Sequence, residues 1–569
     1  MAVRGDPDDL QRTAGDSGNE RSRLCAAMAA GILSGCGKEN LASDAQPASV
    51  NAASSKEIRA SEADEGVLNL VQGPGAINMD TTTMDSVWVN RGGIVKGLMF
   101  RSLFLPDSTL TWLSPDLAKS WEISEDQLHY TIVMDEGNTW HDGEPVTADD
   151  VVWSISTILK AAQANAIYTN AFSEISGAQD WKNGKAHKLD GIKADGAVIT
   201  IDLDRPVGNF LNVLGQFAIL PKHLLEQSDP LELHNDPFWA NPVGNGMYKL
   251  DTFIKGSYFD IVPYEGYKGR KPAIARIRTT NVADVVAAAQ AGKVDFINTN
   301  AADQIALFNQ IPSFKATPVD MLFYRYLVCN IKSPDGTDNL KMSDKRVRKA
   351  LLMAIDRESL ASSLYPDLAQ VNNTGVPSGL AEYNKDSENY SYNPEQAKKM
   401  LEEAGFDFSK TLKLRYYYGD QSSIDFMTAI ASYWNAIGIQ VDVQKFQGDA
   451  TTELFTIKDY DLALKGLSAF GYEEWYGEYA STNANFKNIF GGDTAFDEKI
   501  NELNAASNLE DRAAILSDLQ KLEQDNLWKL PVFTMQNVFY VNEDRVETAG
   551  EFGNPWFNYD MKFEDWKLK

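Results

Sequence analysis

Three consecutive stretches decide the fold class of this chain: LKLRYYY at residues 412–418, IDFMTAIASYWNA at residues 424–436 and IQVDV at residues 439–443. The first and the third stretch predict short strands, and the middle one predicts a helix between them. Consecutive strand, helix and strand segments build an α/β unit. The sequence therefore predicts an α/β domain in this part of the chain.

Further segments extend this pattern in both directions. Residues 281–292, rich in Ala and Val, predict a helix that leads into a strand at residues 293–298. A helix followed by a strand is typical of α/β folds. Additional strands are predicted at residues 67–71, 130–134, 198–203, 530–533 and 538–541, and a helical pair at residues 497–525.

Two helix starts can be read from their capping residues. Thr147 with Asp150 three positions later predicts a capping box, and Asn393 followed by Pro394 predicts a second N-terminus. Gly405 can end that second helix in the left-handed conformation. We attribute the adjacent acids Asp149 and Asp150 to compensation of the helix dipole, not to acid/base chemistry.

The amino-terminal part predicts a lipoprotein signal. The stretch LSGC, which ends at Cys36, follows an apolar run at residues 24–32 with Arg21 and Arg23 in front of it. The run is shorter than the roughly 20 residues that cross a bilayer, but it suits the apolar region of a cleavable signal. Cys36 is then the lipidated first residue of the mature protein. The alternative is a short buried helix with an ordinary cysteine.

Two N-terminal segments are therefore set apart from the fold. Residues 1–35 are expected to be a leader, of which residues 1–20 fit no signal peptide. Residues 36–65 contain mostly Ser, Ala, Asn, Asp and Lys and are expected to form a flexible tether. The folded body is expected to begin near Val67.

Composition limits what this body can be. It holds most of a 569-residue chain that is 43% hydrophobic and 11% aromatic, so two or three packed domains are expected. The net charge of −27 repels phosphate backbones, which disfavours nucleic-acid binding. Cys329 is the single cysteine after the signal, so no disulfide is expected, and its apolar surroundings predict a buried thiol.

Several blocks, taken in order, resemble the peptide-, dipeptide- and nickel-binding family (family 5) of extracytoplasmic solute-binding proteins that serve ABC importers. The matching blocks are LAKSWE at residues 117–122, WHDGEPVTADDV at 140–151, GNGMYKL at 244–250, RVRKA at 346–350, AIDR at 354–357 and AIGI at 436–439. The resemblance spans about residues 67–569.

The resemblance implies an α/β, two-lobed periplasmic-binding-protein-like fold with a two-strand hinge and an additional third domain. By that pattern domain I takes residues 66–105, 229–318 and 535–569, domain II takes residues 106–228, and domain III takes residues 319–534. A ligand would bind in the cleft between domains I and III, and hinge closure would trap it.

The implied function is that of a receptor and not of an enzyme. A monomer, lipid-anchored to the bacterial cell membrane, would capture oligopeptides and deliver them to the permease subunits of an ABC importer, without a cofactor. An oligosaccharide is the alternative ligand. A secreted hydrolase is the competing reading, but the sequence has neither a Gly-x-Ser-x-Gly elbow nor a His-Glu-x-x-His motif.

No metal site is expected. The five histidines lie at positions 129, 141, 187, 223 and 234, and none of them pair at ligand spacing. We expect a structural role for His141, in a turn shared with relatives that bind no metal. Nickel is therefore not the expected cargo.

The resemblance places the binding loop after the strand at residues 461–464. In peptide-binding relatives this loop carries an aromatic residue and, three positions later, an aspartate that pairs with the free amino terminus of the ligand. Here Leu467 and Phe470 stand at these positions, so that anchor is absent. Either Glu473 or Glu474 supplies the charge instead, or the ligand has no free amine there; both acids can equally be solvated loop charge.

Other candidates surround this loop. We expect Ser468, Ala469 and Gly471 to contact the ligand, and we expect aromatic rings to form apolar walls or stacking faces for it. These rings are Tyr472, Trp475, Tyr476 and Tyr479. Asn300, beside Asn298 and Thr299, is a polar candidate, with Tyr324 across from it. Arg91, with Trp88 and Asn90, lies on an early loop that the family brings near the cleft. Each of these can instead be structural.

Overall fold

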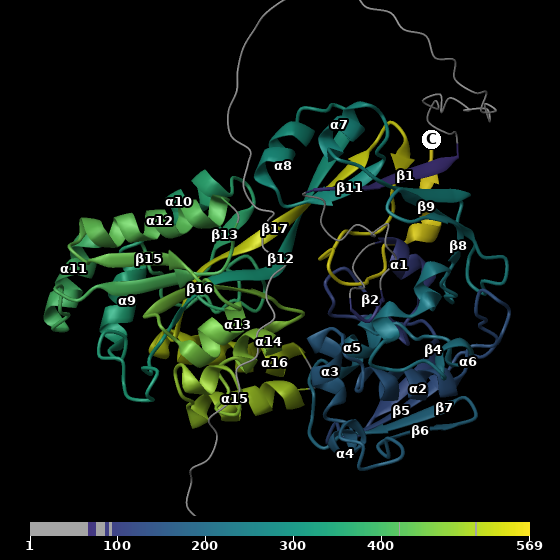
Figure 1. Ribbon diagram of the computed structural model, residues 1–569, viewed down its shortest axis with the longest axis horizontal. Coiled ribbons are helices and arrows are strands. Elements are labelled where there is room, and N and C mark those ends of the chain that lie inside the picture. Colours follow the sequence, from purple (N-terminus) through teal and green to yellow (C-terminus); the bar gives the residue numbers. More distant parts are fainter. Residues whose placement is uncertain (1–65, 75–85, 90–93, 420, 507–508) are drawn as a thin grey trace, which may run out of the picture. The chain divides into compact units, whose positions relative to one another are not determined.

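The structure is a computed structural model that describes residues 66–74, 86–89, 94–419, 421–506 and 509–569. Its largest element is a sheet of eleven strands within these residues, in the order β15-β14-β16-β12-β17-β11-β1-β10-β9-β8, with β13 paired to β17 (Figure 1). The strands are β1 (Val67–Gln72), β8 (Tyr248–Ile254), β9 (Tyr258–Pro263), β10 (Arg276–Asn281), β11 (Phe296–Thr299), β12 (Phe314–Cys329), β13 (Ala369–Val371), β14 (Leu412–Tyr416), β15 (Val441–Lys445), β16 (Leu462–Ser468) and β17 (Lys529–Asn542).

Two long antiparallel strands, β12 and β17, hold this sheet together. They pair from Phe314 opposite Asn542 to Val328 opposite Lys529, with irregular register in two places. On one side lie β15, β14 and β16, here called the β14 half; on the other lie β11, β1, β10, β9 and β8, here called the β1 half. The two halves are therefore parts of one hydrogen-bonded ladder.

The prediction of two separate strands at residues 530–533 and 538–541 is wrong, because β17 is continuous. The polar residues Thr534, Gln536 and Asn537 resemble a turn in the sequence. In the structure neighbours on both edges of β17 pair with this segment: Met535 lies opposite Phe323 of β12 and Ala369 of β13. A strand paired on both edges does not need an apolar sequence throughout.

The predicted α/β unit at residues 412–443 is confirmed. Strand β14 runs parallel to β15, with Leu412 opposite Val441, and α12 (Gln421–Ala436) connects them. The indole of Trp434 on α12 donates to the carbonyl of Leu351 at 2.9 Å, which fixes the helix on its neighbour α9 (Lys345–Met353). Helices α10 (Arg357–Leu364) and α11 (Pro394–Glu403) complete this region; Asn393 caps α11 and Gly405 follows it with φ +71°, as expected.

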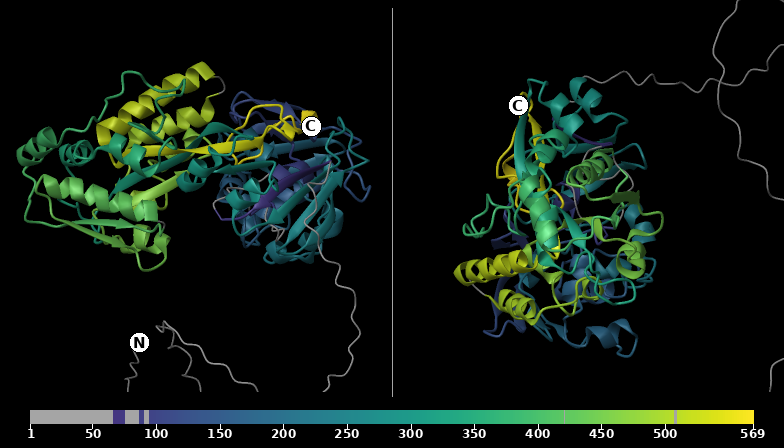
Figure 2. Two further views of the ribbon diagram at one scale, coloured as in Figure 1. Left: turned by 90° about the horizontal axis from the view of Figure 1, so that it is seen from above. Right: turned by 90° about the vertical axis from the view of Figure 1, so that its left-hand side faces the viewer.

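Helices cover both faces of the β14 half. Phe426 of α12 packs edge-on against Phe533 of β17 at 5.5 Å, on one face. On the other face lie α14 (Tyr472–Gly477), α15 (Thr494–Ala505) and α16 (Leu509–Asn526), of which α15 and α16 are the predicted helical pair. Figure 2 shows α12 and the α15–α16 pair on opposite sides of the long strands. The short turns α13 (Ala450–Thr452) and η3 (Glu453–Ile457) precede β16.

The β1 half carries α7 (Val285–Gln290) and α8 (Ala302–Phe308) beside β11. Phe308 of α8 stacks on Tyr540 of β17 at 4.8 Å. Helix α7 is shorter than the predicted residues 281–292, because Asp284 caps it by accepting hydrogen bonds from the amides of Val286 and Ala287. The short strands β18 (Val546–Glu547) and β19 (Lys567–Leu568) pair near the C-terminal end of the chain.

A separate antiparallel sheet forms from residues 118–202, in the order β4-β5-β7-β6. Its strands are β4 (Ala118–Ile123), β5 (His129–Met134), β6 (Ile192–Asp195) and β7 (Val198–Asp202). The predicted capping box starts α2 (Ala148–Ile158): Thr147 Oγ1 accepts from the Asp150 amide, and the Asp150 carboxylate accepts from the Thr147 amide at 2.8 Å. Around this sheet lie α3 (Ala166–Phe172), α4 (Ala178–Lys182), α5 (Phe210–Gln216) and α6 (Lys222–Leu225).

The segment of residues 73–117 joins β1 to this small sheet. It contains α1 (Ile94–Met99) and the paired strands β2 (Phe104–Pro106) and β3 (Leu113–Pro115). After α6 come the short turns η1 (Leu233–Asn235) and η2 (Pro237–Ala240), and η4 (Phe486–Asn488) and η5 (Phe563–Asp565) lie further along. None of the helices within the described ranges is both long enough and apolar enough to cross a bilayer.

Cys329 is buried, as predicted, and burial raises the pKa of its thiol to about 12. His141 is held by backbone groups, with Nε2 3.1 Å from the Gly246 carbonyl oxygen and Nδ1 accepting from the Gly244 amide at 3.1 Å. Burial lowers the pKa of His141 to about 4, so the ring is neutral. These contacts give His141 the structural role that the sequence predicts.

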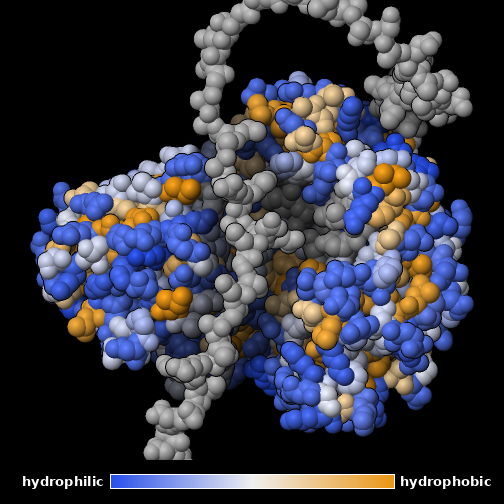
Figure 3. All heavy atoms as spheres, in the orientation of Figure 1, coloured by the Kyte–Doolittle hydropathy of each residue, from blue (hydrophilic) through white to orange (hydrophobic). Residues whose placement is uncertain are grey.

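Hydrophilic residues dominate the face shown in Figure 3.

Candidate ligand-binding site

The predicted binding loop follows β16 and leads into α14. Leu467 is half-buried, Ser468 is exposed, and Ala469 is buried with its amide bonded to the Leu322 carbonyl at 2.8 Å. Gly471 is the N-cap of α14, and its amide donates to the Glu474 carboxylate at 2.8 Å. The loop is therefore a fixed turn from a strand into a helix.

Phe470 lies in an apolar cluster at the start of this turn. The cluster contains Leu110, Phe470 and Tyr559, and the ring of Phe557 meets Phe470 edge-on at 5.0 Å. Phe470 is only 5% exposed. Phe470 stands where the resemblance expects an amine-binding aspartate. This position therefore carries an apolar side chain, and the side chains around it are apolar or aromatic as well.

Glu473 is not a solvated loop charge. Its Oε1 lies 2.7 Å from a terminal guanidinium nitrogen of Arg512 on α16, and only 11% of its side chain is exposed. An acid that is paired inside the protein offers little charge to a ligand. The sequence left two roles open for Glu473, an anchor for the ligand amine and a solvated loop charge. The ion pair with Arg512 speaks against both roles.

Glu474 also faces inward. Its carboxylate accepts from Gly471 and from Asn209 Nδ2, the latter at 3.0 Å. Burial, together with the negative charge of Glu473, raises the pKa of Glu474 to about 8, although the two hydrogen bonds oppose this shift. Glu474 is therefore largely protonated at neutral pH and is neither solvated nor a fixed negative charge.

The expectation that the aromatic residues of this segment line a surface is wrong for three of the four. Trp475, Tyr476 and Tyr479 are each 0% exposed. They surround the carboxylate of Glu523 on α16, which accepts from the Trp475 indole at 3.2 Å, the Tyr476 hydroxyl at 3.1 Å and the Tyr479 hydroxyl at 3.3 Å. Burial raises the pKa of Glu523 to about 7. These buried side chains fix α14 and the residues after it to α16, and in this way support the loop before α14.

Tyr324 belongs to the same buried group and not to an exposed wall. It is 2% exposed, its hydroxyl donates to the Gly375 carbonyl at 2.5 Å, and its ring centroid is 4.4 Å from that of Trp475. Tyr472 is half-buried, with its hydroxyl 3.5 Å from a carboxylate oxygen of Glu382. Of the predicted aromatic wall, Tyr472 alone keeps some exposure.

The remaining candidates lie elsewhere. Asn300 is half-buried directly after β11. Trp88 is 1% exposed, stacks on Phe217 at 5.4 Å and donates to the Ala218 carbonyl, so it is a core residue. Arg91, Asn90 and Cys36 lie outside the described residues.

The structure points to one residue that the sequence reasoning missed. Arg325 lies on β12 between Tyr324 and Tyr326, and its side chain points to the opposite face of the sheet because neighbours along a strand alternate. Its guanidinium carbon lies 3.8 Å from the ring centroid of Tyr418 and 4.9 Å from that of Phe323. Its Nε and Nη1 are buried and have no hydrogen-bond partner.

A second unpartnered polar group lies on the neighbouring long strand. Asn537 of β17 is 0% exposed, and both its amide oxygen and its amide nitrogen lack partners. Phe539, two residues along on the same face of β17, stacks on Phe552 at 4.6 Å. Trp556 of the same C-terminal segment packs edge-on against Phe323 at 5.0 Å.

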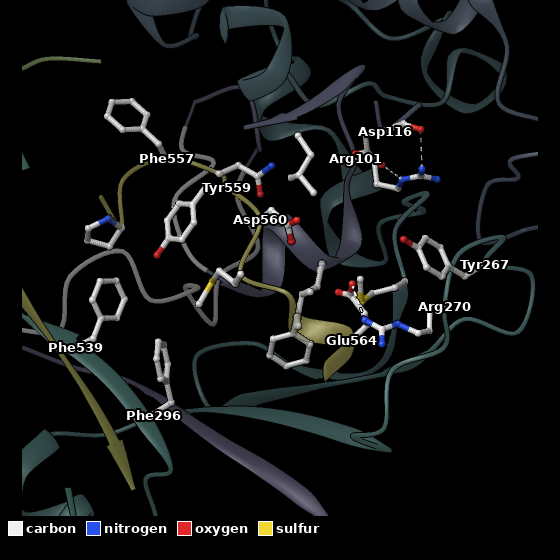
Figure 4. A pocket seen from close by; sticks show the side chains of 18 of the residues that line it. Arg101, Asp116, Tyr267, Arg270, Phe296, Phe539, Phe557, Tyr559, Asp560 and Glu564 are labelled. Atoms are coloured by element: carbon white, nitrogen blue, oxygen red, sulfur yellow. Dashed lines mark hydrogen bonds and ion pairs between the residues drawn. The ribbon is translucent and has the colours of Figure 1, made fainter. Parts of the chain in front are cut away.

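A cavity of about 310 Å³ opens beside this segment (Figure 4). Phe296, Phe539, Phe557 and Tyr559 form its apolar side. Its charged groups are already paired: Arg101 with Asp116 at 2.6 Å and Arg270 with Glu564 at 3.1 Å. Phe557 and Tyr559 thus separate this cavity from Phe470.

Among the described residues no group of three or more His, Cys, Asp or Glu side chains is arranged to hold a metal ion.

The sequence matches the profile of the bacterial extracellular solute-binding proteins, family 5 (middle region), over residues 113–494. A putative ABC transporter peptide-binding protein of Brucella ovis is 26% identical over 381 residues, which cover 65% of this chain and 68% of that protein. The oligopeptide-binding protein AppA of Bacillus subtilis is 26% identical over 417 residues, which cover 68% of this chain and 71% of AppA.

Two solved structures show the same fold. That of Bacillus subtilis AppA in complex with a nonapeptide matches with a TM-score of 0.65 and 21% identity, over 89% of this chain and 99% of that one. NikZ from Campylobacter jejuni in complex with Ni(L-His) matches with a TM-score of 0.67 and 22% identity, over 88% of this chain and 99% of NikZ. The fold is therefore the α/β, two-lobed fold of these binding proteins. The profile covers more than half of the sequence, and the chain belongs to family 5 of the bacterial extracellular solute-binding proteins, the extracytoplasmic binding proteins of ABC transporters.

Proposed function

We propose that this protein captures oligopeptides and delivers them, chemically unchanged, to the permease of an ABC importer. The family supports a binding role, and peptides are named as the ligands of the Brucella ovis and Bacillus subtilis relatives.

One observation on this chain favours a peptide. The two long strands between the halves of the large sheet carry buried polar groups without partners: the amide of Asn537 on β17 and two guanidinium nitrogens of Arg325, Nε and Nη1, on β12. Buried polar groups in native proteins nearly always have partners. A peptide supplies an N–H donor and a C=O acceptor for a side-chain amide, and a carboxylate for a guanidinium.

The ligand is proposed to bind where the β14 half and the β1 half meet. We propose that domain I takes residues 66–105, 229–318 and 535–569, domain II residues 106–228 and domain III residues 319–534. The two boundaries between domains I and III then fall within β12 and β17. Leu467, Ser468, Phe470, Gly471, Tyr472 and Asn300 remain proposed contact residues. Ala469, Glu473, Trp475 and Tyr324 are buried or already paired and hold these residues in place. Arg91 remains a proposal from the sequence alone.

We further propose that Cys36 carries the lipid that keeps this receptor at the membrane. The segment of residues 36–65 would then connect the lipid to the folded body. Two or more acyl chains are needed for stable anchoring, since one chain binds only marginally.

A comparison of the ligands retained from two mixtures tests the proposal. The full-length chain is incubated with a peptide mixture and, separately, with an oligosaccharide mixture, and the molecules that co-elute are identified by mass spectrometry. We expect intact peptides to be retained. Retention of saccharides alone, or conversion of either mixture into smaller products, would refute the proposed function.

A further inference from the structure

The structure also suggests how a peptide is oriented at this site. We infer that Arg325 binds a carboxylate of the peptide, so that the ligand is held by its negative end and not by its amino terminus. This inference rests on the proposed function, since it names the ligand group that the same site recognises.

Among the described residues, Arg325 differs from the inward-facing Arg101, Arg348 and Arg357 in having no oxygen partner. Arg357 donates to the carbonyls of Asn372, Pro531 and Tyr390. Arg348 donates to four backbone carbonyls, and Arg101 to Asp116 and Asn138. Within the described ranges, Arg325 is the one arginine or lysine with buried nitrogens that lack partners.

Such an arrangement is unfavourable in an empty protein. A guanidinium stays charged at all relevant pH values, and a buried charge without a counter-charge destabilises the folded state. The chain carries 80 acidic against 53 basic residues, so acids to pair with Arg325 are plentiful in the composition. None of the acids among the described residues does so, as expected for a guanidinium whose partner is an external anion.

The geometry leaves the guanidinium ready for a planar anion. Tyr418 lies against its face at 3.8 Å, and Phe323 is close by at 4.9 Å. A ring on the face of a guanidinium leaves the in-plane N–H groups available, and these form a fork that matches the two oxygens of a carboxylate. Arg325 is partly exposed as a residue and its Nη2 is not among the buried atoms, so a ligand reaches the fork from the Nη2 side.

A glycine makes this stacking possible. Gly466 of β16 lies directly opposite Arg325 in the ladder. A Cβ atom at Gly466 would come within 2.1 Å of the Tyr418 hydroxyl oxygen. Any other residue here would therefore displace Tyr418 from its position against the guanidinium.

The charges nearby favour an anion over an ammonium group. Phe470 lies four residues beyond Gly466, about 13 Å along an extended chain. It is apolar, Glu473 is neutralised by Arg512, and the Glu474 carboxyl is turned toward Gly471 and Asn209. Among the described residues of this turn and the strands before it, Arg325 is thus a fixed charge without a counter-charge. A carboxylate also fits a strongly acidic protein better than a multiply charged phosphate does.

The test uses alanine peptides of increasing length, each prepared with a free C-terminal carboxylate and with a C-terminal amide. A third set of amides carries one internal glutamate. Calorimetry with the full-length chain measures the affinity for each peptide. We expect the free acids to bind about 10- to 100-fold more tightly than the neutral amides, the range expected for hydrogen bonds to a charged group.

The third set identifies the source of the carboxylate. If the C-terminus is the recognised group, the glutamate amides bind as weakly as the neutral amides; if an acidic side chain serves, they bind as tightly as the acids. Either result supports the inference. Equal affinity for all three sets overturns it and leaves the proposed function standing, whereas no binding of any peptide refutes the proposed function.

Two variants complete the test. Arg325→Met should remove the preference for acids, while Arg346→Met, which alters an exposed arginine paired with Asp344, should keep it. The free energy of unfolding without ligand separates binding from structure: Arg325→Met should leave it unchanged or raise it, because an unpaired charge is lost. A lower unfolding free energy together with an unchanged acid preference would show a purely structural role.

Discussion

Asn209 and Glu474 connect the region of the small sheet to the binding loop: Nδ2 of Asn209 donates to Oε1 of Glu474 at 3.0 Å. Asn209 directly precedes α5, and Glu474 lies in the first turn of α14. The same carboxyl also accepts from the Gly471 amide. One buried acid thus fixes the turn after β16 and joins it to a distant part of the chain.

The pKa of Glu474 predicts a pH-dependent stability. In the folded protein this pKa is about 8, above its usual value of 4.5, so the native state favours the protonated acid. Its contribution to the unfolding free energy is therefore complete below about pH 4.5 and is lost as the pH rises through 8. Glu474→Gln should flatten the decline of the unfolding free energy between pH 5 and 8, measured by urea unfolding. Part of the slope will remain, because Glu523, with a pKa of about 7, acts in the same direction. An unaltered slope would contradict the assignment.

A second prediction concerns the buried pairing of Glu478 with Lys465 and Lys529. The carboxylate oxygens lie 2.8 Å and 2.9 Å from the two ammonium groups, which lower the pKa of Glu478 to about 2 despite its burial. Glu478→Gln should lower the unfolding free energy by about 3–5 kcal/mol, because it leaves two cations without their counter-charge. Glu502→Gln, which breaks the exposed pair with Lys499, should change it by less than about 1 kcal/mol. Similar losses in both variants would argue against the buried network.

The same two ion pairs of Glu478 set the response to acid. The pKa of Glu478 is lowered in the folded state, so its contribution is present above about pH 4.5 and is lost as the pH falls toward 2. Acid unfolding of the Glu478→Gln variant should therefore depend less steeply on pH in this window than that of the unaltered protein.

Phe470 is predicted to matter for stability as well as for the site. Phe470→Ala removes a buried ring from the cluster with Leu110, Tyr559 and Phe557 and should lower the unfolding free energy by about 3 kcal/mol. Trp112→Ala, at a side chain that is 65% exposed, should have little effect on denaturant unfolding. If the alanine variant of Phe470 unfolds like the unaltered protein, the cluster is not a packed contact in solution.

The lipid anchor gives the fourth prediction. Cys36→Ser should release the protein from the membrane fraction into the soluble fraction of cells that produce it, because only the thiol can be lipidated. Cys25→Ser serves as the matched control and should stay with the membranes. Membrane association of both variants would refute lipidation at Cys36.

The sequence was most informative where local rules decide the structure. The α/β unit, the Thr147 capping box and the Asn393 cap follow from residues within a few positions of one another, and the structure has them all. The candidate site was less predictable. Trp475, Tyr476 and Tyr479 suggested a surface, and their burial depends on the carboxylate of Glu523, which a different helix brings to them.

Arg325 shows the opposite case, in which a local signal was present. A single arginine within the apolar stretch FYRYLVC points away from its two tyrosine neighbours, and strand alternation alone places it on the other face. Only the structure shows that, within the part of the chain it describes, no acid pairs with Arg325. Likewise, the continuity of β17 depends on pairing with β12 and β13, which no short window of sequence contains.

The place of β17 in the chain constrains how the molecule is made. This strand pairs with β12, β13 and β11 and so links the β14 half to the β1 half, yet it begins only at Lys529, long after β11 and β12. The ribosome has to translate residues 529–542 before β11 can be joined to β12. In a nascent chain halted before Lys529, the strands of each half can pair among themselves, but the central strand between the halves is missing.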